Sequence, residues 1–106
     1  MREIKISEDA YLDIEVMFAY ISQDNKAAAE KLRRKIYDGI KGLADFPFMY
    51  PVIQEEDAPG AERGYRYMVV KPYIVFYRVL DDTIVIARVL HAKQNRITAL
   101  FDSFDD

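Results

Sequence analysis

The residue best suited to proton transfer near neutral pH lies in the last strand-like stretch of the chain. His91 is the only histidine, and it ends the apolar run in IVIARVLHAK (84–93). An imidazole gains or loses a proton more readily near pH 7 than any other unperturbed side chain. Two interpretations of His91 are open. It is a catalytic acid or base, or it is a polar residue that makes a local hydrogen bond at the end of a strand.

The strands that would position His91 are indicated by three apolar stretches at 63–70, 73–80 and 83–90. The connections between them, Lys71-Pro72 and Asp81-Asp82, are short enough for hairpins. The middle stretch is apolar on both faces apart from Arg78, so we expect a central strand that is covered on both sides.

Two-residue loops would fix which side chains meet on this sheet. Arg66 would lie opposite Tyr77, and Arg88 would lie opposite Val75, diagonal to Tyr77 and within reach of it. Arg66, Tyr77 and Arg88 would then share one face, with Tyr73 near them. The two side chains expected on the other face, or at its rim, are Arg78 and His91.

Two arginines around a tyrosine have more than one use. Charge-assisted hydrogen bonds from Arg66 and Arg88 could hold a phosphate, or a carboxylate of a partner protein. Alternatively, the aliphatic parts of the arginines cover the tyrosine rings beside an exposed sheet face. A slip of one residue would reverse every assignment to a face.

The rest of the chain predicts two helices and a further strand. REIKI (2–6) alternates like a strand, and Ser7 can cap a helix whose apolar residues run from Ala10 to Ile21. Asp24-Asn25 can cap a second helix that extends to Leu43. The tail at 91–104 has helical spacing. We therefore predict one α+β domain over residues 1–106. Its parts are a short first strand, an N-terminal αα-hairpin packed on one face of a mainly antiparallel β-sheet, and a short C-terminal helix.

Composition excludes several classes of function. The 106 residues carry a net charge of −3 and no cysteine, so disulfide frameworks and thiolate metal sites are excluded. We predict no metal and no cofactor, since the lone histidine has no clustered ligands and no glycine-rich phosphate loop is present. No stretch resembles a signal peptide or a membrane span, so we expect a cytoplasmic protein. Between Arg63 and Arg96, however, seven Lys/Arg face two Asp/Glu, which suits an anionic partner.

The order of elements and three sequence stretches resemble the RelE/ParE family of toxins from type II toxin–antitoxin modules of the plasmid-stabilisation type. The stretches are SEDAYLDIEVMFAYI (7–21), AAEKLRRKIYDGIKGLADFPFMYP (28–51) and YRYMVVKPYIVFYRVLDDTIVIARVLHAKQ (65–94). The resemblance implies a growth-inhibiting toxin that a cognate antitoxin neutralises in a hetero-oligomer. It also implies one of two cellular targets: mRNA cut in the ribosome by RelE-like members, or DNA gyrase bound by ParE-like members.

Departures from the RelE-like pattern favour the ParE-like branch. RelE-like members usually carry an arginine in the stretch that matches YIVFY (73–77), and Ile74 stands at its position. Gln94, not arginine, follows Lys93. The tyrosine often found in the tail is also missing, since Leu100 or Phe101 lies there. With these groups absent, we expect His91 to be a strand-end residue and not a catalyst.

Three functions are compatible with the sequence. The first is a toxin that acts by binding a target such as gyrase. The second is a ribosome-dependent mRNA endonuclease with an altered set of catalytic residues, drawn from Arg66, Tyr77, Arg88, His91 and Lys93. The third is a non-toxic binding module of the same fold. For binding to the antitoxin or the target we name two groups of residues. One is Arg66, Tyr73, Tyr77, Arg88 and Lys93 on the sheet, and the other is Arg33 and Arg34, with Lys31 and Lys35, on the second helix.

Overall fold

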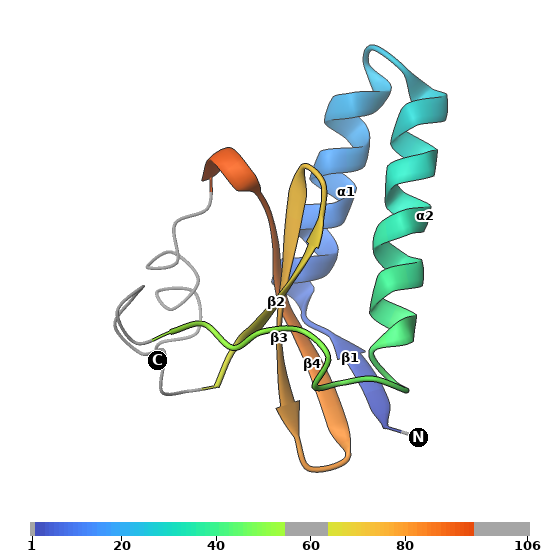
Figure 1. Cartoon of the computed structure of the whole chain (residues 1–106). Helices are drawn as coiled ribbons and strands as arrows, with labels where there is room; N and C mark the ends of the chain where they lie inside the picture. Colours follow the sequence, from blue (N-terminus) through green and yellow to red (C-terminus); the bar gives the residue numbers. More distant parts are fainter. Residues whose placement is uncertain (1, 55–63, 95–106) are drawn as a thin grey trace.

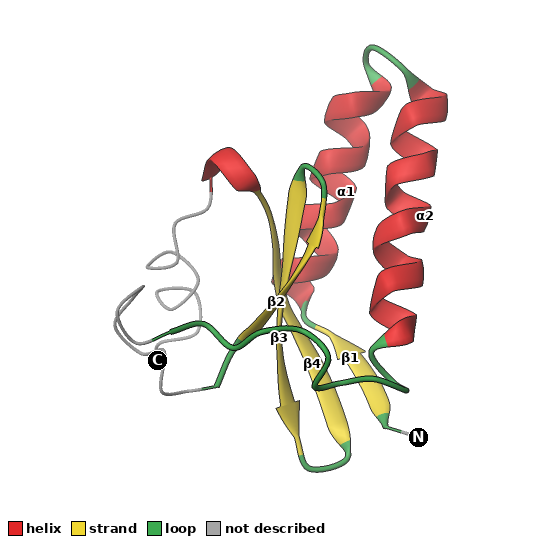
Figure 2. Ribbon diagram, in the orientation of Figure 1, coloured by secondary structure: helices red, strands yellow, loops and turns green. Residues whose placement is uncertain are grey.

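A computed structural model describes residues 2–54 and 64–94 of the chain. Two antiparallel helices pack on one face of a four-stranded sheet (Figures 1 and 2). The elements in chain order are β1 (Glu3–Ile6), α1 (Glu8–Ser22), α2 (Lys26–Gly42), β2 (Arg66–Val70), β3 (Tyr73–Leu80), β4 (Thr83–His91) and a short 3-10 helix, η3 (Ala92–Gln94). The predicted α+β class and the helical hairpin are confirmed. Apart from η3, the predicted C-terminal helix lies outside the described residues.

Both helices begin at the residues that the sequence indicated. The Ser7 hydroxyl accepts a hydrogen bond from the backbone N–H of Ala10 at 3.0 Å, and Asn25 Oδ1 accepts one from Ala28 at 3.0 Å. These caps satisfy backbone donors that the first turn of a helix leaves without partners. The link between α1, which ends at Ser22, and α2, which begins at Lys26, is short, so the two helices lie side by side.

The sheet has the strand order β1-β4-β3-β2. β1 runs parallel to β4, whereas β4, β3 and β2 form two antiparallel hairpins. Lys71-Pro72 and Asp81-Asp82 are the two-residue turns between them, as expected. Asp81 has a φ of 50°, a left-handed conformation that tight hairpin turns often require.

β1 is shorter than its neighbour, so half of β4 lacks a strand on that side. The parallel pairing ends at Ile6, opposite Ile86, while β4 continues to His91. Beyond that point the Ser7 hydroxyl donates to the carbonyl of Ala87 at 2.8 Å. A carboxylate oxygen of Asp13, on α1, accepts from the N–H of Val89 at 2.9 Å. Side chains thus take the place of a neighbouring strand.

A β-bulge divides the pairing of β3 with β4. From the turn up to Tyr77, which lies opposite Ile86, the register is the one expected for a two-residue loop. Between Phe76 and Tyr77 the register shifts by one residue, and Arg88 lies opposite Phe76. The predicted pairing of Arg88 with Val75 is therefore wrong, because β4 holds one more residue than the alternation allowed.

Apolar side chains cover both faces of the central strand, β3. On the helix side the core contains Ile14, Ile36, Val75 and Tyr77, all without measurable exposure. On the opposite face a smaller cluster contains Ile53, Tyr65, Ile74, Phe76 and Ala87. The expectation of a central strand covered on both sides is confirmed. In the part of the chain that the structure describes, no helix is both long and apolar enough to cross a bilayer.

Candidate functional site

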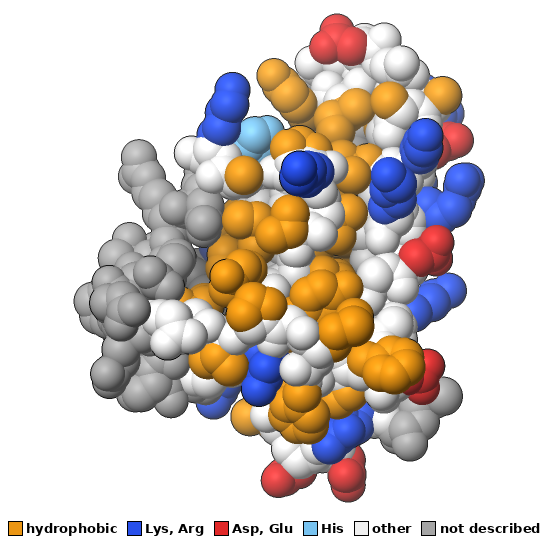
Figure 3. All heavy atoms as spheres, viewed as in Figure 1, with side chains coloured by type: hydrophobic (Ala, Val, Ile, Leu, Met, Phe, Trp, Pro, Cys, Tyr) orange, Lys and Arg blue, Asp and Glu red, His pale blue; other side chains and the backbone are white. Residues whose placement is uncertain are grey.

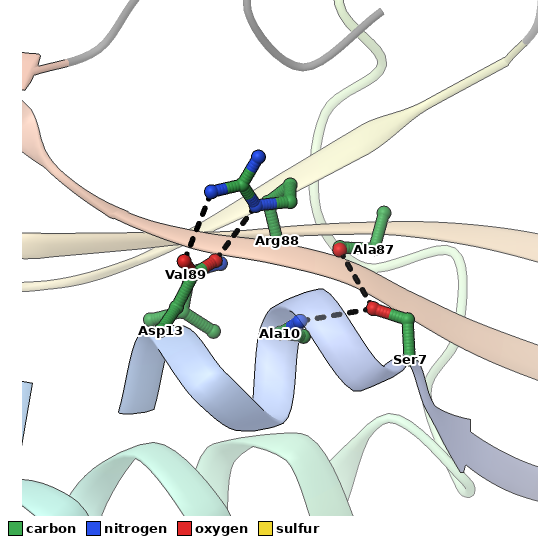
Figure 4. Close-up of polar contacts among 6 residues, drawn as sticks. All are labelled: Ser7, Ala10, Asp13, Ala87, Arg88 and Val89. Carbon is green, nitrogen blue, oxygen red and sulfur yellow. Dashed lines mark hydrogen bonds and ion pairs between the residues drawn. The ribbon is translucent and has the colours of Figure 1, made fainter. Parts of the chain in front are cut away.

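Arg88 is held by a carboxylate from the first helix. Its Nε and one terminal nitrogen donate to the two oxygens of Asp13 at 2.8 and 2.9 Å, as Figure 4 shows. One of those oxygens also accepts the N–H of Val89. The hydrogen bonds to Asp13 raise the pKa of Arg88, against an opposing effect of burial. The pair ties α1 to β4, and both oxygens of the carboxylate accept hydrogen bonds.

The bulge moves Arg88 away from the tyrosine with which it was expected to cluster. Arg88 lies opposite Phe76, which belongs to the cluster on the face away from the helices. Tyr77 packs into the core on the helix side. The prediction that Arg66, Tyr77 and Arg88 share one face is therefore wrong, because the extra residue in β4 reverses the alternation above the bulge.

Arg66 on β2 and Tyr77 on β3 are opposite each other, as predicted. The Tyr77 side chain is fully buried, and its hydroxyl donates to the carbonyl of Pro47 at 2.9 Å. Burial raises the pKa of Tyr77, and the positive charge of Arg66 works against that increase. Arg66 donates to the carbonyl of Tyr50 at 2.6 Å. Both side chains thus anchor the segment that follows α2.

His91 lies beside Tyr73 at the end of β4. The two rings meet edge to face with centroids 5.1 Å apart, and the residues are paired across the strands. Of the two places expected for His91, the other face or its rim, the other face is wrong. The bulge puts His91 beside Tyr73 at the strand end, and Tyr73 packs against the helix-side core. His91 Nδ1 accepts the N–H of Lys93 at 3.0 Å. This is the local strand-end hydrogen bond that the sequence suggested.

The position of the arginine typical of RelE-like members is part of the apolar packing. Ile74 is buried in the cluster with Phe76 and Ala87, on the face away from Tyr77. Tyr77, in turn, is enclosed on the helix side. Ile74 and Tyr77 therefore lie on opposite faces of the sheet, and a cation in place of Ile74 would not share a surface with Tyr77.

The basic residues of α2 differ in their surroundings. Lys31, Arg34 and Lys35 are exposed. Arg33 is half-buried, and its guanidinium lies 3.7 Å from the centroid of the Phe18 ring and 3.6 Å from Glu15. Arg33 therefore links the two helices, whereas its three neighbours form an exposed basic row.

Three residues that matter in the structure were not singled out from the sequence. They are Asp13, Phe48 and Arg2. Asp13 holds Arg88. The guanidinium of Arg2 lies 5.3 Å from the centroid of the Phe48 ring, and that of Arg66 lies 5.1 Å from it. A signal for Asp13 did exist: it adjoins the buried helical positions Ala10 and Ile14. A carboxylate at the border of a buried face usually needs a partner.

Most polar side chains of this arrangement hold the fold together. Across residues 2–54 and 64–94, no group of three or more His, Cys, Asp and Glu could hold a metal ion. Asp13 is committed to Arg88 and Val89, and His91 accepts a backbone N–H through one ring nitrogen.

Comparison with known proteins identifies the class to which this fold belongs. A family model described as the ParE toxin of the type II toxin-antitoxin system, parDE, matches residues 4–96. The match spans nearly the whole chain, and the chain belongs to the ParE toxin family. A search of curated proteins finds no significant match.

Among solved structures, the chain is similar to one described as "Chromosomal ParDE TA system from P. aeruginosa". The TM-score is 0.63 at 21% sequence identity, and the match covers 86% of this chain and 96% of the other. At this identity the similarity shows a shared fold. It agrees with the helical hairpin on a four-stranded sheet in Figure 2.

Proposed function

We propose that this protein is the toxin of a type II toxin–antitoxin module, and that it inhibits growth by binding a target such as DNA gyrase. A cognate antitoxin neutralises it by forming a complex. Membership of the ParE family supports the toxin role. The similar solved structure is that of a ParDE system, which supports a paired antitoxin.

The observation that favours binding over RNA cleavage is the burial of Ile74. Cleavage needs a base for the 2′-hydroxyl, an acid for the leaving oxygen and cations for the developing charge. At the position that carries an arginine in RelE-like members, this chain places an aliphatic side chain inside a packed cluster. Of the other candidates, Tyr77 is enclosed and Arg88 is paired with Asp13.

A supercoiling assay with purified gyrase tests the proposal. We expect the protein to inhibit supercoiling in proportion to its concentration, and we expect its co-purified antitoxin to restore activity. Full gyrase activity at saturating toxin would reject gyrase as the target. Codon-phased cuts of translated mRNA, seen by primer extension, would instead favour the endonuclease. Unaffected growth on induced expression, with neither effect, would favour the non-toxic binding module.

The exposed basic row of α2 is our candidate for the contact with the target. Lys31, Arg34 and Lys35 are exposed and lie within two turns of one helix. Reversing all three charges to glutamate should weaken gyrase inhibition. The matched control reverses the charge of three exposed lysines outside this row, Lys5, Lys26 and Lys41. It should inhibit gyrase about as strongly as the wild type does.

The antitoxin contacts expected on the sheet divide into separate places. Arg66 lies at the β2 side, whereas Arg88 is occupied by Asp13 at the open half of β4. Tyr73 and Lys93 lie at the other end of the sheet, near His91. An antitoxin that needs Arg66 should bind Arg66→Glu less tightly. Unchanged affinity would remove that residue from the interface.

A further inference from the structure

The segment after α2 is anchored to the sheet by three hydrogen bonds to its carbonyl groups. Pro47 accepts from the Tyr77 hydroxyl at 2.9 Å, and Tyr50 accepts from Arg66 at 2.6 Å. Pro51 accepts from the N–H of Tyr67 at 3.1 Å. Pro47 itself is buried. The backbone between these points is therefore held in place, which lowers the entropic cost of ordering this segment when a partner binds.

The side chains on this anchored segment nevertheless face solvent. Phe48 is 57% exposed, and Phe46 and Met49 are exposed to a slightly greater extent. Figure 3 shows hydrophobic side chains gathered over the segment after α2 and over β2, with lysine and arginine groups beside them. Contiguous exposed apolar surface on a folded domain often marks a site of interaction.

Two arginines border the Phe48 ring. The guanidinium of Arg2 lies 5.3 Å from the ring centroid and that of Arg66 lies 5.1 Å from it. Arg2 donates through Nε to the carbonyl of Asp81 at 3.1 Å, and Arg66 donates to that of Tyr50. Each guanidinium has five N–H donors, so most of its capacity is left for an acceptor from outside.

We propose that these five side chains form a docking surface for a protein segment in which carboxylates alternate with apolar side chains. We call it the Phe48 surface, and its residues are Arg2, Phe46, Phe48, Met49 and Arg66. Aromatic residues, methionine and arginine are the types enriched in protein interfaces. The two guanidinium groups supply the charge that carboxylates complement, and the rings and the thioether supply apolar area.

A protein segment fits this surface better than a nucleic acid does. Exposed Asp45 precedes Phe46, and exposed Asp81 and Asp82 form the turn whose carbonyl receives Arg2. Nucleic-acid binding relies on many cations along a continuous phosphate backbone. These aspartates would repel such a backbone, whereas separate carboxylates on a peptide can reach the arginines between them.

Selection of peptides on the intact protein tests the proposal. Random dodecapeptides displayed on phage would be selected against immobilised protein, and the winning sequences would be synthesised and measured by fluorescence anisotropy. We expect winners that combine Asp or Glu with Leu, Phe or similar residues. Phe48→Ala should weaken their binding about tenfold, as expected for a central interface residue. Arg2→Gln should weaken it about threefold and reduce its dependence on salt.

Matched variants separate this surface from other exposed groups. Val16→Ala removes an apolar side chain that is 59% exposed on α1, and Arg34→Gln removes an exposed arginine of α2. Both should bind the winning peptides like the wild type. Arg66 is left intact, because its loss would release the segment as well as the charge.

Several results would overturn the proposal. Winners without acidic residues, or equal binding to Phe48→Ala, would exclude the Phe48 surface as the docking site. Binding of oligo-dT in place of peptides would assign it to nucleic acid. Self-association in sedimentation experiments, abolished by Phe48→Ala, would assign it to a second copy of the chain. The inference extends the proposed function, because Arg66 is also a candidate antitoxin contact. The measurement uses neither gyrase nor antitoxin, so its outcome is separate from the test of that function.

Discussion

Arg66 and Arg88 lie on strands separated only by β3, yet their guanidinium groups have different surroundings. Arg88 makes two hydrogen bonds to Asp13 and keeps 20% of its side chain exposed. Arg66 bonds one backbone carbonyl and stands beside an exposed aromatic ring. The comparison shows that residue type did not decide which arginine stays available to a partner. One extra residue in β4 and a carboxylate from α1 decided it.

The largest effect should come from removing the partner of Arg88. Asp13→Ala removes the carboxylate that accepts hydrogen bonds from a largely buried guanidinium and from the N–H of Val89. We expect the free energy of unfolding to fall by about 3 kcal/mol, measured by urea denaturation. Asp9→Ala removes the same charge from an exposed position of the same helix and should cost less than about 1 kcal/mol. Equal losses in the two variants would contradict the role given to Asp13.

On the Arg66 side, Tyr77→Phe should have the next largest effect. The variant leaves the carbonyl of buried Pro47 without its donor, which should cost about 1.5 kcal/mol at pH 7.

The same variant should change the response to alkaline pH. Burial raises the pKa of Tyr77 in the folded state above the ordinary value of 10.0. Above about pH 10 the folded state therefore binds more protons than the unfolded state, so stability is fully present below that pH and declines above it. Tyr77→Phe should decline less steeply between pH 9 and 11 in urea titrations. A residual slope is expected, because burial raises the pKa values of Tyr73 and Tyr37 as well. Identical slopes would rule out a contribution from Tyr77.

Arg66→Met should be less costly than either variant. It loses the hydrogen bond to the carbonyl of Tyr50 but keeps much of the side-chain packing, so we expect a loss of about 1 kcal/mol. Chemical denaturation would measure the loss, with Arg34→Met as the exposed control. If Arg66→Met destabilised the protein as much as Asp13→Ala does, the contrast between the two arginines would fail.

The smallest effect concerns two neighbouring arginines of α2. Arg33→Ala removes the cation over the Phe18 ring and should cost about 0.5–1 kcal/mol. Arg34 is exposed, so Arg34→Ala should change stability by less than about 0.5 kcal/mol. Thermal unfolding of the two variants side by side would measure the difference. A larger loss in Arg34→Ala would show that exposure does not distinguish them.

Local patterns were sufficient to predict most of the fold. Ser7 and Asn25 cap the helices, and both two-residue turns lie where the sequence indicated. The pairing of Arg66 with Tyr77 follows from one of these turns. Such features depend on a few adjacent residues, and a single sequence contains that information.

The candidate site was less predictable, because it depends on contacts between distant segments. No residue type in IARVL signals a bulge, yet the bulge sets the faces of Arg88 and His91. Asp13 and Arg88 are 75 positions apart, beyond any periodic pattern. Phe48 follows a buried proline in a non-repeating segment, so alternation could not indicate that its ring is exposed.

The side chains beside the half of β4 that lies beyond β1 also affect how two copies of this protein could associate. An uncovered strand presents N–H and C=O groups with which another chain can pair, and such pairing leads to aggregates. Here the Ala87 carbonyl already has the Ser7 hydroxyl, and the Val89 N–H already has Asp13. An incoming strand would have to displace a carboxylate that also neutralises Arg88. Pairing of a second copy with this half of β4 would therefore have to break the contacts of Ser7 and Asp13 before new strand hydrogen bonds could form.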